Sequence, residues 1–453
     1  MILPERIRDL NNHRPQKKNY VLYWMQASQR VLDNHALHYA IGLANQWKCP
    51  LLVYFGLTDG YPGANLRHYR FMLEGLREVA AEVKEMGVAF VLRKEDPEEG
   101  VMELGREASA VVVDCGYTRI QKQWRSQAAI QLQCPLIQVE TDVIVPVETA
   151  YPREAWSAAV LRRRVSQLLS DYLVPLHPQP LRYPWMGELP EGLDVNDLPS
   201  ILELLDVDRT VPPVPGLQGG TARALDSFTS FVEHNLDHYH EDRNDPSLQG
   251  ASGMSPYLHF GQISPLTLAL MARNRPGPGS KAFLEELIVR RELAVNFVHY
   301  NAEYDTVQCL PEWAVRTLSE HASDDRETLY SFSELERSQT HDPYWNAAQL
   351  EMVRTGSMHG YMRMYWGKKI LEWSATWEEA FQTALDLNNR WELDGRDPNG
   401  FAGVAWCFGK HDRPWQERAI FGKIRYMNDK GLTRKFDMDG YVQRISELEP
   451  YPF

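Results

Sequence analysis

Residues 341–373 read HDPYWNAAQLEMVRTGSMHGYMRMYWGKKILEW, and residues 387–415 read LNNRWELDGRDPNGFAGVAWCFGKHDRPW. The two segments interleave tryptophan, tyrosine, asparagine, aspartate, arginine and methionine, whereas an ordinary core is built from leucine, isoleucine and valine. They contain neither a metal-ligand motif nor a phosphate-binding loop. Tryptophan and tyrosine offer flat, oxidisable rings with one polar group. Such a composition favours a pocket for a flat redox-active heterocycle or a stacked base.

The second half of the chain reads as a series of helices. Beyond residue 217 strand patterns nearly disappear, and apolar residues recur at helical spacing in LDSFTSFVEHNLDHY (225–239), FLEELIVRRELAVNFVHY (283–300) and WEEAFQTALDLNNRWEL (377–393). We therefore predict an all-α domain over residues 218–453, which is within the usual size range of a domain.

The first third of the chain alternates two kinds of segment. Short apolar runs with the character of buried strands lie at 20–25, 50–57, 88–93, 110–115 and 135–140. Helix-like segments separate them at 34–48, 68–86, 97–108 and 119–132. This alternation predicts a Rossmann-like, doubly wound parallel sheet with helices on both faces. We expect a ligand at its carboxyl edge, near Asp114 to Arg119, although neither GxGxxG nor GxxxxGK[ST] is present.

Proline marks the junction between the two predicted domains. Residues 175–215 carry nine of the 28 prolines, a density typical of a connector. The segment just before it, 153–173, reads as a basic helix. The predicted organisation is an N-terminal arm at 1–19, an α/β domain at 20–174, a connector at 175–217 and the helical domain at 218–453.

Composition limits the class of protein. The 453 residues carry a net charge of −13, which argues against a wholly basic nucleic-acid binder. The five scattered cysteines predict a reducing compartment. Neither an apolar leader nor a run of membrane-spanning length is seen, so we expect a cytoplasmic protein without a membrane partner.

One window opposes the acidic total. Residues 410–435 contain eight lysines or arginines and three acidic residues, a local charge of +5. Two interpretations stay open, namely a surface that faces the phosphates of a nucleic acid and an ordinary solvated face. If the window binds DNA, Lys410 and Arg413 are the leading candidates.

Two smaller patterns also have two interpretations each. Ser255 and Ser264 each precede a proline, as at helix starts, where the free N–H groups are either simply capped or available to an anion. His234 and His238 have the spacing of a metal-binding pair, but a solvated helix face is the favoured interpretation. We predict no metal site.

Taken together, the motifs resemble one family. GMSPYLHFGQIS (253–264), EELIVRRELAVNF (285–297), the two segments quoted first and RAIFGKIRYMN (418–428) are similar to sequences of the photolyase/cryptochrome flavoproteins. More narrowly, they resemble class II cyclobutane pyrimidine dimer photolyases. The resemblance spans essentially the whole chain and is most specific in its C-terminal part. It implies a light-driven lyase that repairs pyrimidine dimers in UV-damaged DNA.

The resemblance implies that the helical domain holds FAD, active in its reduced form FADH−. Arg363 would pair with Asp394 beside the flavin, with Asp397 as a second candidate, and the cation would stabilise the anionic ring. Asn388 would face flavin N5, where an amide can donate or accept; its alternative role is a helix cap. The other implied cofactor residues are Tyr239, Arg243, Ser252, Ser255 and Arg290. A second, antenna chromophore of the deazaflavin or folate type would bind in the α/β domain.

On the substrate side, the resemblance implies Glu286, Met364 and Trp406. A protonated Glu286 would donate to a carbonyl of the lesion. Met364 and Trp406 would form walls around the flipped-out dimer, with Trp406 also at the DNA surface. Glu286 and Arg290 share one helical face, so an internal ion pair is the alternative role for Glu286. Val289 departs from the family, because many photolyases carry tryptophan just before this arginine.

The resemblance further implies a relay of two tryptophans that carries electrons from the protein surface to oxidised FAD. Trp366 would lie near the flavin and Trp345 at the outer end. Trp373 shares a helical face with Trp366, but we expect it to pack in the core, as we do Trp377 and Trp391.

Two alternative activities have weaker support. A cryptochrome-type light sensor would bind FAD without repairing DNA, but Asn388 and the lack of a long tail before Phe453 favour repair. A photolyase for (6-4) photoproducts would use a histidine-centred pocket, for which GSMHGYMRM offers only His359. We expect a monomer that associates with the nucleoid when it binds DNA.

Overall fold

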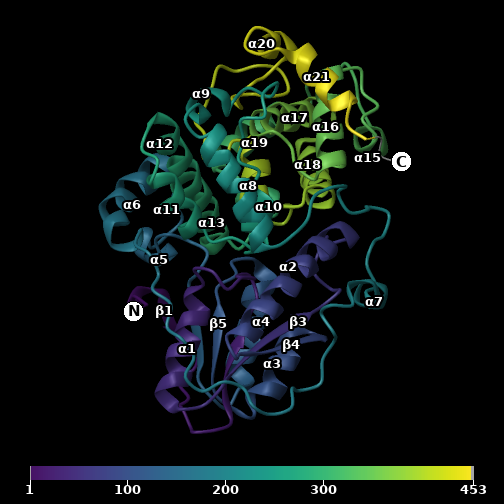
Figure 1. Ribbon diagram of the computed structural model, residues 1–453. Helices are drawn as coiled ribbons and strands as arrows, with labels where there is room; N and C mark the ends of the chain where they lie inside the picture. The colour runs from purple at the N-terminus through teal and green to yellow at the C-terminus, as the bar shows by residue number, and fades with distance from the viewer. Residues whose placement is uncertain (1, 450–453) are drawn as a thin grey trace.

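The computed structural model describes residues 2–449 and has two regions, an α/β region at the base of Figure 1 and a helical region above it. The α/β region is built on one six-stranded sheet with the order β1-β6-β5-β2-β3-β4. Neighbouring strands are parallel except for β1 with β6. The strands are β1 (Ile7–Asp9), β2 (Tyr20–Trp24), β3 (Leu51–Leu57), β4 (Ala89–Lys94), β5 (Ala108–Asp114) and β6 (Leu136–Val139).

Helices cover both faces of this sheet. Val21 and Tyr23 of β2 belong to the core beneath α1 and α2, while Leu22 and Trp24 belong to the core beneath α3 and α4. Successive strand residues point to opposite faces, so a continuous apolar strand fills two cores at once. The doubly wound prediction is confirmed. The helices are α1 (His35–Trp47), α2 (Leu66–Glu85), α3 (Pro97–Gly105) and α4 (Arg119–Gln131).

The proline-rich segment 175–217 packs along the outer strand of the sheet. The Trp185 N–H donates to the Gly87 carbonyl at 2.8 Å, and the Leu193 N–H donates to the Leu92 carbonyl of β4 at 2.7 Å. The segment includes the short helix α7 (Leu198–Leu204). It therefore covers an edge whose backbone groups would otherwise be open to another strand.

The second region is helical, as predicted. The remaining helices are α5 (Val147–Ala150), α6 (Ala158–Tyr172), α8 (Thr221–His234), α9 (Tyr239–Asp242), α10 (Ser255–His259), α11 (Pro265–Arg273), α12 (Pro278–Leu284), α13 (Arg291–Tyr300), α14 (Glu312–Glu320), α15 (Phe332–Glu336), α16 (Pro343–Thr355), α17 (Gly360–Trp373), α18 (Trp377–Trp391), α19 (Pro398–Cys407), α20 (Asp429–Thr433) and α21 (Met438–Ser446). Single turns lie at η1 (Pro4–Arg6), η2 (Glu285–Arg290) and η3 (Val307–Cys309). Within residues 2–449, none of the helices combines the length and apolar character needed to cross a bilayer.

Helix α6 lies against the helical region (Figure 1), although the predicted boundary assigns it to the α/β domain. Leu161 and Val165 form its buried stripe and pack in one core with Phe228 and Phe283. The Arg162 guanidinium also pairs with Glu285 at 2.5 Å. The apolar stripe of α6, and not its position in the sequence, therefore decides which region the helix packs against.

One buried arginine joins the two regions. Arg67 of α2 is 1% exposed, and its guanidinium donates to the carbonyls of Trp391 at 2.5 Å and Val353 at 2.6 Å. These carbonyls lie in the last turns of α18 and α16, where the helix leaves carbonyl groups without a helical partner. Because the cation satisfies them, the sheet and the cavity-bearing helices are held in a fixed relation.

Candidate active site

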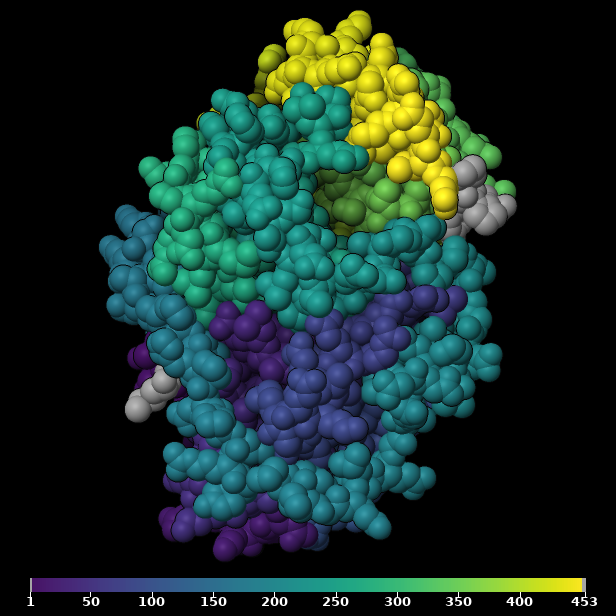
Figure 2. Space-filling view, in the orientation of Figure 1, coloured from purple at the N-terminus to yellow at the C-terminus, as the bar shows by residue number. Residues whose placement is uncertain are grey.

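A cavity of about 550 Å³, here called the helical cavity, opens among the helices. Its wall comes from the segment 248–255, from η2 and the start of α13, from 355–364, and from α19 and Arg444 of α21. Figure 2 shows this face hollowed between the teal segment and yellow α21. Of the residues implied by the family resemblance, those lining it are Tyr239, Ser252, Ser255, Glu286, Arg290, Arg363, Met364, Asp394 and Trp406.

Arg363 of α17 is held by Glu392, and not by Asp394 as expected. Its Nη2 lies 2.9 Å from Glu392 Oε2, and the Glu392 side chain is only 1% exposed. Glu392 caps the end of α18 in an extended conformation, and its carboxylate reaches α17 from there. Asp394 lies on the cavity wall two residues later. Sequence reasoning missed Glu392, although its place just after the LNNRW helix end was visible.

Burial sets the protonation of this cluster. It raises the pKa of the Glu392 carboxyl well above its usual range; the Arg363 guanidinium lowers it and the neighbouring Asp394 raises it. Arg363 is therefore the group that favours a carboxylate at this buried position. A fixed cation with one buried counter-charge faces the cavity, and it suits a ligand that carries or develops negative charge.

Asn388 lies beside this cation and is 1% exposed. Its Oδ1 accepts from Arg363 Nη1 at 3.3 Å, so its side chain does not cap a helix. The chain must approach it closely, since a Cβ at Gly400 would lie 3.0 Å from Asn388 Nδ2. Asp397 has a different position: it caps α19 by accepting from Asn399 N at 2.8 Å and pairs with His259 at 3.2 Å.

Glu286 lies on η2, a π-helical turn of the kind that often marks a functional site. Its Oε1 lies 2.7 Å from Arg243 Nη1, and the two side chains are 34% and 31% exposed. Glu286 thus forms an ion pair, but with Arg243 and not with Arg290, and the pair is partly exposed and not internal. Arg290 lies 5.8 Å over the Trp406 ring. Val289 packs in the core and does not contribute to the wall.

The two serine–proline motifs differ. Ser264 is the N-cap of α11, and its hydroxyl accepts from Leu266 N at 3.2 Å. Ser255 is instead the first residue of α10, whose N-cap is Met254, so the expected cap at Ser255 is wrong. As a result, Ser255 lines the cavity together with Ser252 and Tyr239.

Trp366 and Trp345 stack face to face, with ring centroids 6.4 Å apart and planes at 6°. Trp366 Nε1 donates to Gln349 Oε1 at 2.8 Å, and Trp345 Nε1 donates to the Trp366 carbonyl at 3.0 Å. Trp345 is 0% exposed. It cannot be the surface end of a relay, because another ring must continue any path to solvent.

Only part of the basic window, residues 410–435, lies at the surface. Lys410 points inward, where it pairs with Glu154 and donates to the Cys309 carbonyl at 2.8 Å. Arg413 is exposed and lies 5.5 Å over Trp415, while Arg425 lies 5.2 Å from the same ring. Trp415 is 41% exposed, and sequence reasoning missed it although it ends the second segment quoted above. The structure thus leaves Arg413 at the surface and removes Lys410 from it.

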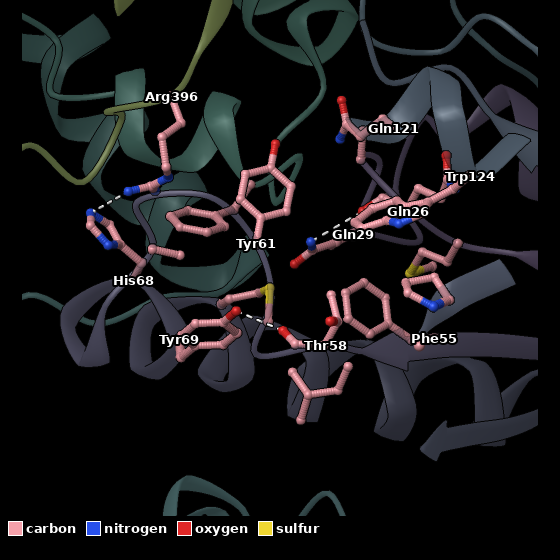
Figure 3. A pocket seen from close by; sticks show the side chains of 18 of the residues that line it. Gln26, Gln29, Phe55, Thr58, Tyr61, His68, Tyr69, Gln121, Trp124 and Arg396 are labelled. Atoms are coloured by element: carbon pink, nitrogen blue, oxygen red, sulfur yellow. Dashed lines mark hydrogen bonds between the residues drawn. The ribbon is translucent and has the colours of Figure 1, made fainter. Parts of the chain in front are cut away.

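A second space of about 100 Å³, here called the sheet cavity, lies at the carboxyl ends of β2 and β3. Figure 3 shows Gln29 and Tyr61 pointing into it, with Phe55 and Trp124 at one end and Arg396 at the other. None of the residues from Asp114 to Arg119 lines the sheet cavity, but Thr118 and Arg119 line a separate space, so a ligand near Asp114 to Arg119 stays a prediction. Asp114 of β5 is fully buried and accepts from Gln26 N and Ala27 N of the β2 loop.

Known proteins similar to this chain can now be compared with it. The DNA photolyase family model matches residues 21–182. The chain is 53% identical over 449 residues to the deoxyribodipyrimidine photo-lyase of Methanothermobacter thermautotrophicus, with 99% of each chain covered. A bacterial class III photolyase from Agrobacterium tumefaciens has a similar structure (TM-score 0.73, 19% identity, 95% of this chain and 87% of that one). So has an archaeal photolyase with two FAD molecules from Sulfolobus tokodaii (TM-score 0.70, 16% identity, 95% and 90%).

Proposed function

This chain belongs to the photolyase/cryptochrome family, and from that premise we propose that it is a class II photolyase that repairs cyclobutane pyrimidine dimers in UV-damaged DNA. The observation that carries the proposal is the helical cavity, with Arg363 fixed by buried Glu392 and touching Asn388. A binding module would need shape alone, whereas this arrangement places a cation, fixed by a buried carboxyl group, on the cavity wall, where it can stabilise negative charge on a bound group.

The helical cavity fits FAD. Its volume of about 550 Å³ lies within the range of ligand cavities, roughly 300–1,000 Å³. Within residues 2–449, the buried Oδ1 of Asp394 has no hydrogen-bond partner. Tyr239, Ser252 and Ser255 would hold the phosphates and ribose, and Arg363, Asn388 and Asp394 the ring. Bound there in its reduced form FADH−, the cofactor would supply light-driven electron transfer to the dimer.

The chain's own residues then hold charge and exclude water. Arg363 stabilises negative charge beside the ring, and Asn388 offers an amide whose two ends suit either protonation state of its partner. Met364 and Trp406 give the dimer apolar and aromatic walls. Glu286 acts on the lesion from its place on η2. Its counter-ion in the structure is Arg243.

DNA approaches the mouth of the helical cavity. An enzyme acting on a base in a duplex must extrude it first, and we propose that the dimer flips out into this cavity. Arg413, with Trp415 and Arg425 beside it, offers cations to the phosphates and an aromatic ring to the neighbouring bases. The protein would act as a monomer, which sedimentation of the complex tests.

The sheet cavity is the proposed place of an antenna chromophore, on chemical grounds. Trp24 Nε1, Gln26 Nε2 and Gln29 Oε1 are buried there without a hydrogen-bond partner within residues 2–449. Its volume of about 100 Å³ is too small for a deazaflavin or folate unless these side chains move. No step of repair is therefore assigned to a second chromophore.

A light-dependent repair assay tests this proposal. Protein reduced with dithionite should restore pyrimidines in a DNA oligomer carrying one cyclobutane dimer, and only under blue light. It should leave a (6-4) photoproduct unrepaired. A protein that binds FAD but repairs neither lesion would instead be a sensor of the cryptochrome type.

A pair of adjacent carboxylates sharpens the assay. Glu286→Ala should lower repair per absorbed photon and leave FAD bound, because Glu286 lines the cavity. Glu285→Ala is the matched control, since Glu285 pairs with Arg162 outside the lining. Equal repair yields for the two variants would exclude Glu286 from the mechanism.

A further inference from the structure

Trp415, the exposed ring of the basic window, lies on a short hairpin. The Trp415 N–H donates to the Lys423 carbonyl at 2.9 Å. Nearer the turn, Arg418 and Gly422 exchange two backbone hydrogen bonds, of 2.9 and 2.7 Å. Residues 415–423 therefore form an antiparallel hairpin, here called the Trp415 hairpin. Because its two sides pair with each other, a contact that holds the turn also restrains the tryptophan.

The two sides of the Trp415 hairpin are held differently. On the second side Phe421 is 2% exposed, and Ile424, which directly follows the hairpin, is 1% exposed. Both pack in the core of the helical region. On the first side, residues 413–419 are all exposed. That side buries little apolar surface, so polar contacts decide how firmly it is held.

One histidine outside the hairpin provides such contacts. His321 directly follows α14, and its Nε2 lies 3.2 Å from Oε1 of Glu417, on the exposed side of the hairpin. Its Nδ1 lies 2.6 Å from Oδ2 of Asp324. The same carboxylate oxygen accepts from the Ile420 N–H of the hairpin turn at 2.7 Å. The imidazole therefore links two carboxylates that both hold the hairpin, an arrangement here called the His321 bridge.

The His321 bridge needs two ring protons. Ionised carboxylates only accept hydrogen bonds, and a neutral imidazole has one N–H, whereas an imidazolium donates from both nitrogens. The hydrogen bond to Asp324 and, to a smaller extent, that to Glu417 raise the pKa of His321, against the effect of burial. The hydrogen bond from the Ile420 N–H and that from His321 lower the pKa of Asp324. The bridge is therefore complete only while the imidazole carries its second proton.

Two cations lie behind the carboxylates of the bridge. Lys423 Nζ lies 3.7 Å from Oε2 of Glu417, and Arg326 helps to lower the pKa of Asp324. Carboxylates, lysine and arginine do not ordinarily titrate between about pH 6 and 8.5, whereas histidine does. Within this cluster, the imidazole of His321 is therefore the group whose charge changes near neutral pH.

We propose that His321 is a positioning residue for DNA binding: its protonated form fixes the hairpin that presents Trp415, and loss of the proton weakens the binding of damaged DNA. This inference rests on the proposed function, because it takes DNA as the ligand of this surface. Arg413 and Arg425 lie 5.5 and 5.2 Å over the Trp415 ring, so a fixed hairpin offers one ring and two cations together. Fixing them beforehand lowers the entropy cost of ordering them on binding.

The direction of the pH effect follows from the raised pKa of His321. The bridge contributes fully below the unperturbed histidine pKa near 6.5, and its contribution is lost as the pH rises through the raised value. DNA that prefers the fixed hairpin must in turn make His321 hold its proton more tightly, because such coupling is reciprocal. Damaged DNA should therefore bind more tightly at about pH 6 than at about pH 8.5.

Fluorescence anisotropy of an oligomer with one cyclobutane dimer, titrated in the dark at constant salt, tests the proposal. From about pH 6 to 8.5 the Kd of the unmodified, FAD-loaded protein should rise about five-fold. His321→Asn should bind with the weaker affinity at every pH. His321→Lys keeps a cation facing both carboxylates and should retain tight binding at the upper end of this range. His234→Asn changes an exposed histidine of α8 and should keep the pH profile of the unmodified protein.

The His321 bridge can also be measured without DNA. Histidine-ring NMR, with the His321 signal assigned from its loss in His321→Asn, should give a pKa above about 6.5 that falls in Glu417→Gln. A pKa at or below about 6.5, or an unchanged pH profile of DNA binding in His321→Asn, overturns the proposal. An unmodified protein that does not prefer dimer-containing over undamaged DNA would instead refute the proposed function, and the NMR titration would still decide whether His321 bridges the two carboxylates.

Discussion

The helical cavity encloses about 550 Å³ and the sheet cavity about 100 Å³. Both are lined by segments that lie far apart in the sequence. They differ in the kind of polar group that they bury. Arg363 on the wall of the helical cavity forms an ion pair with buried Glu392, and the Oδ1 of Asp394 there has no hydrogen-bond partner among residues 2–449. In the sheet cavity, amide atoms of Gln26 and Gln29 remain buried without a partner among residues 2–449.

This difference separates a preformed site from one that must adjust. Buried charge is stable only when paired, so the Arg363–Glu392 pair holds the helical cavity open and in shape. Neutral amides tolerate repacking at lower cost, so the sheet cavity can close around its own side chains. The predictions below test whether the two cavities are independent and whether charge is what distinguishes them.

The largest effect is expected from filling the helical cavity. Gly403 lies in α19 on the cavity wall, and a Cβ there would sit 3.4 Å from Arg363 Cδ. Gly403→Leu should fold, because leucine is favoured over glycine in a helix by roughly 1 kcal/mol. The folded variant should purify without flavin colour, as measured by absorption. A yellow Gly403→Leu protein would place FAD elsewhere.

Next in size is the loss of the buried cation. Arg363→Met leaves Glu392 buried without its partner, and should lower the free energy of unfolding by about 3–5 kcal/mol at pH 7. Burial raises the pKa of Glu392 in the folded state, so the variant should lose further stability as pH rises above the unfolded value near 4.5. Urea unfolding at several pH values measures this.

A second substitution and a control complete that experiment. Glu392→Gln, added to Arg363→Met, should recover most of the loss and remove the pH dependence. Arg316→Met breaks a pair with Glu312 whose side chains are 66% and 87% exposed, and should cost no more than about 1 kcal/mol. If Arg363→Met and Arg316→Met cost the same, buried charge does not distinguish the helical cavity.

The sequence predicted the sheet well because its strands are buried on both faces. AVVVDC needs no distant partner to be recognised as such a strand, and it forms most of β5. The edge strand β1 was missed because Ile7–Asp9 is short and polar, and it exists only through pairing with β6. Periodicity thus predicts elements whose burial is uniform, and it fails where pairing alone makes the strand.

The candidate site was predictable in its residue types but not in its pairings. The family resemblance implied that Arg363 and Asn388 both lie beside the flavin, and the structure shows the two side chains in contact. The partner of Arg363 depends on where the chain leaves α18, which spacing does not determine. Lys410 appeared to be a surface cation because its neighbours are basic, yet Glu154, far away in the sequence, draws it inward. Local charge cannot reveal such a distant counter-ion.

A smaller effect is expected in the pH dependence of the free energy of unfolding, through a histidine of the helical cavity. Burial and, to a smaller extent, the nearby Arg444 lower the pKa of His359 on its wall to about 4. The folded state therefore holds His359 neutral. His359 in its neutral form contributes its full stabilisation above the unfolded pKa near 6.5. This stabilisation is lost as the pH falls toward 4. Between pH 7 and 4.5, the unmodified protein should lose about 2 kcal/mol more than His359→Gln. The control variant His234→Gln changes an exposed histidine, and it should lose as much stability between pH 7 and 4.5 as the unmodified protein.

The smallest effect is expected from filling the sheet cavity, and it decides whether the two cavities are independent. Ala64 lies on the loop before α2 and lines this cavity. Ala64→Leu should change the free energy of unfolding by no more than about 1 kcal/mol. It should keep FAD and repair dimers normally when flavin is excited directly, while losing any binding of added deazaflavin measured by fluorescence. The cavities are nevertheless linked through one loop, because Arg396, which donates to His68 at 2.8 Å in the sheet cavity, follows Asp394 of the helical cavity by two residues. If Ala64→Leu also releases FAD, that loop transmits the change, and the two cavities form one cooperative unit.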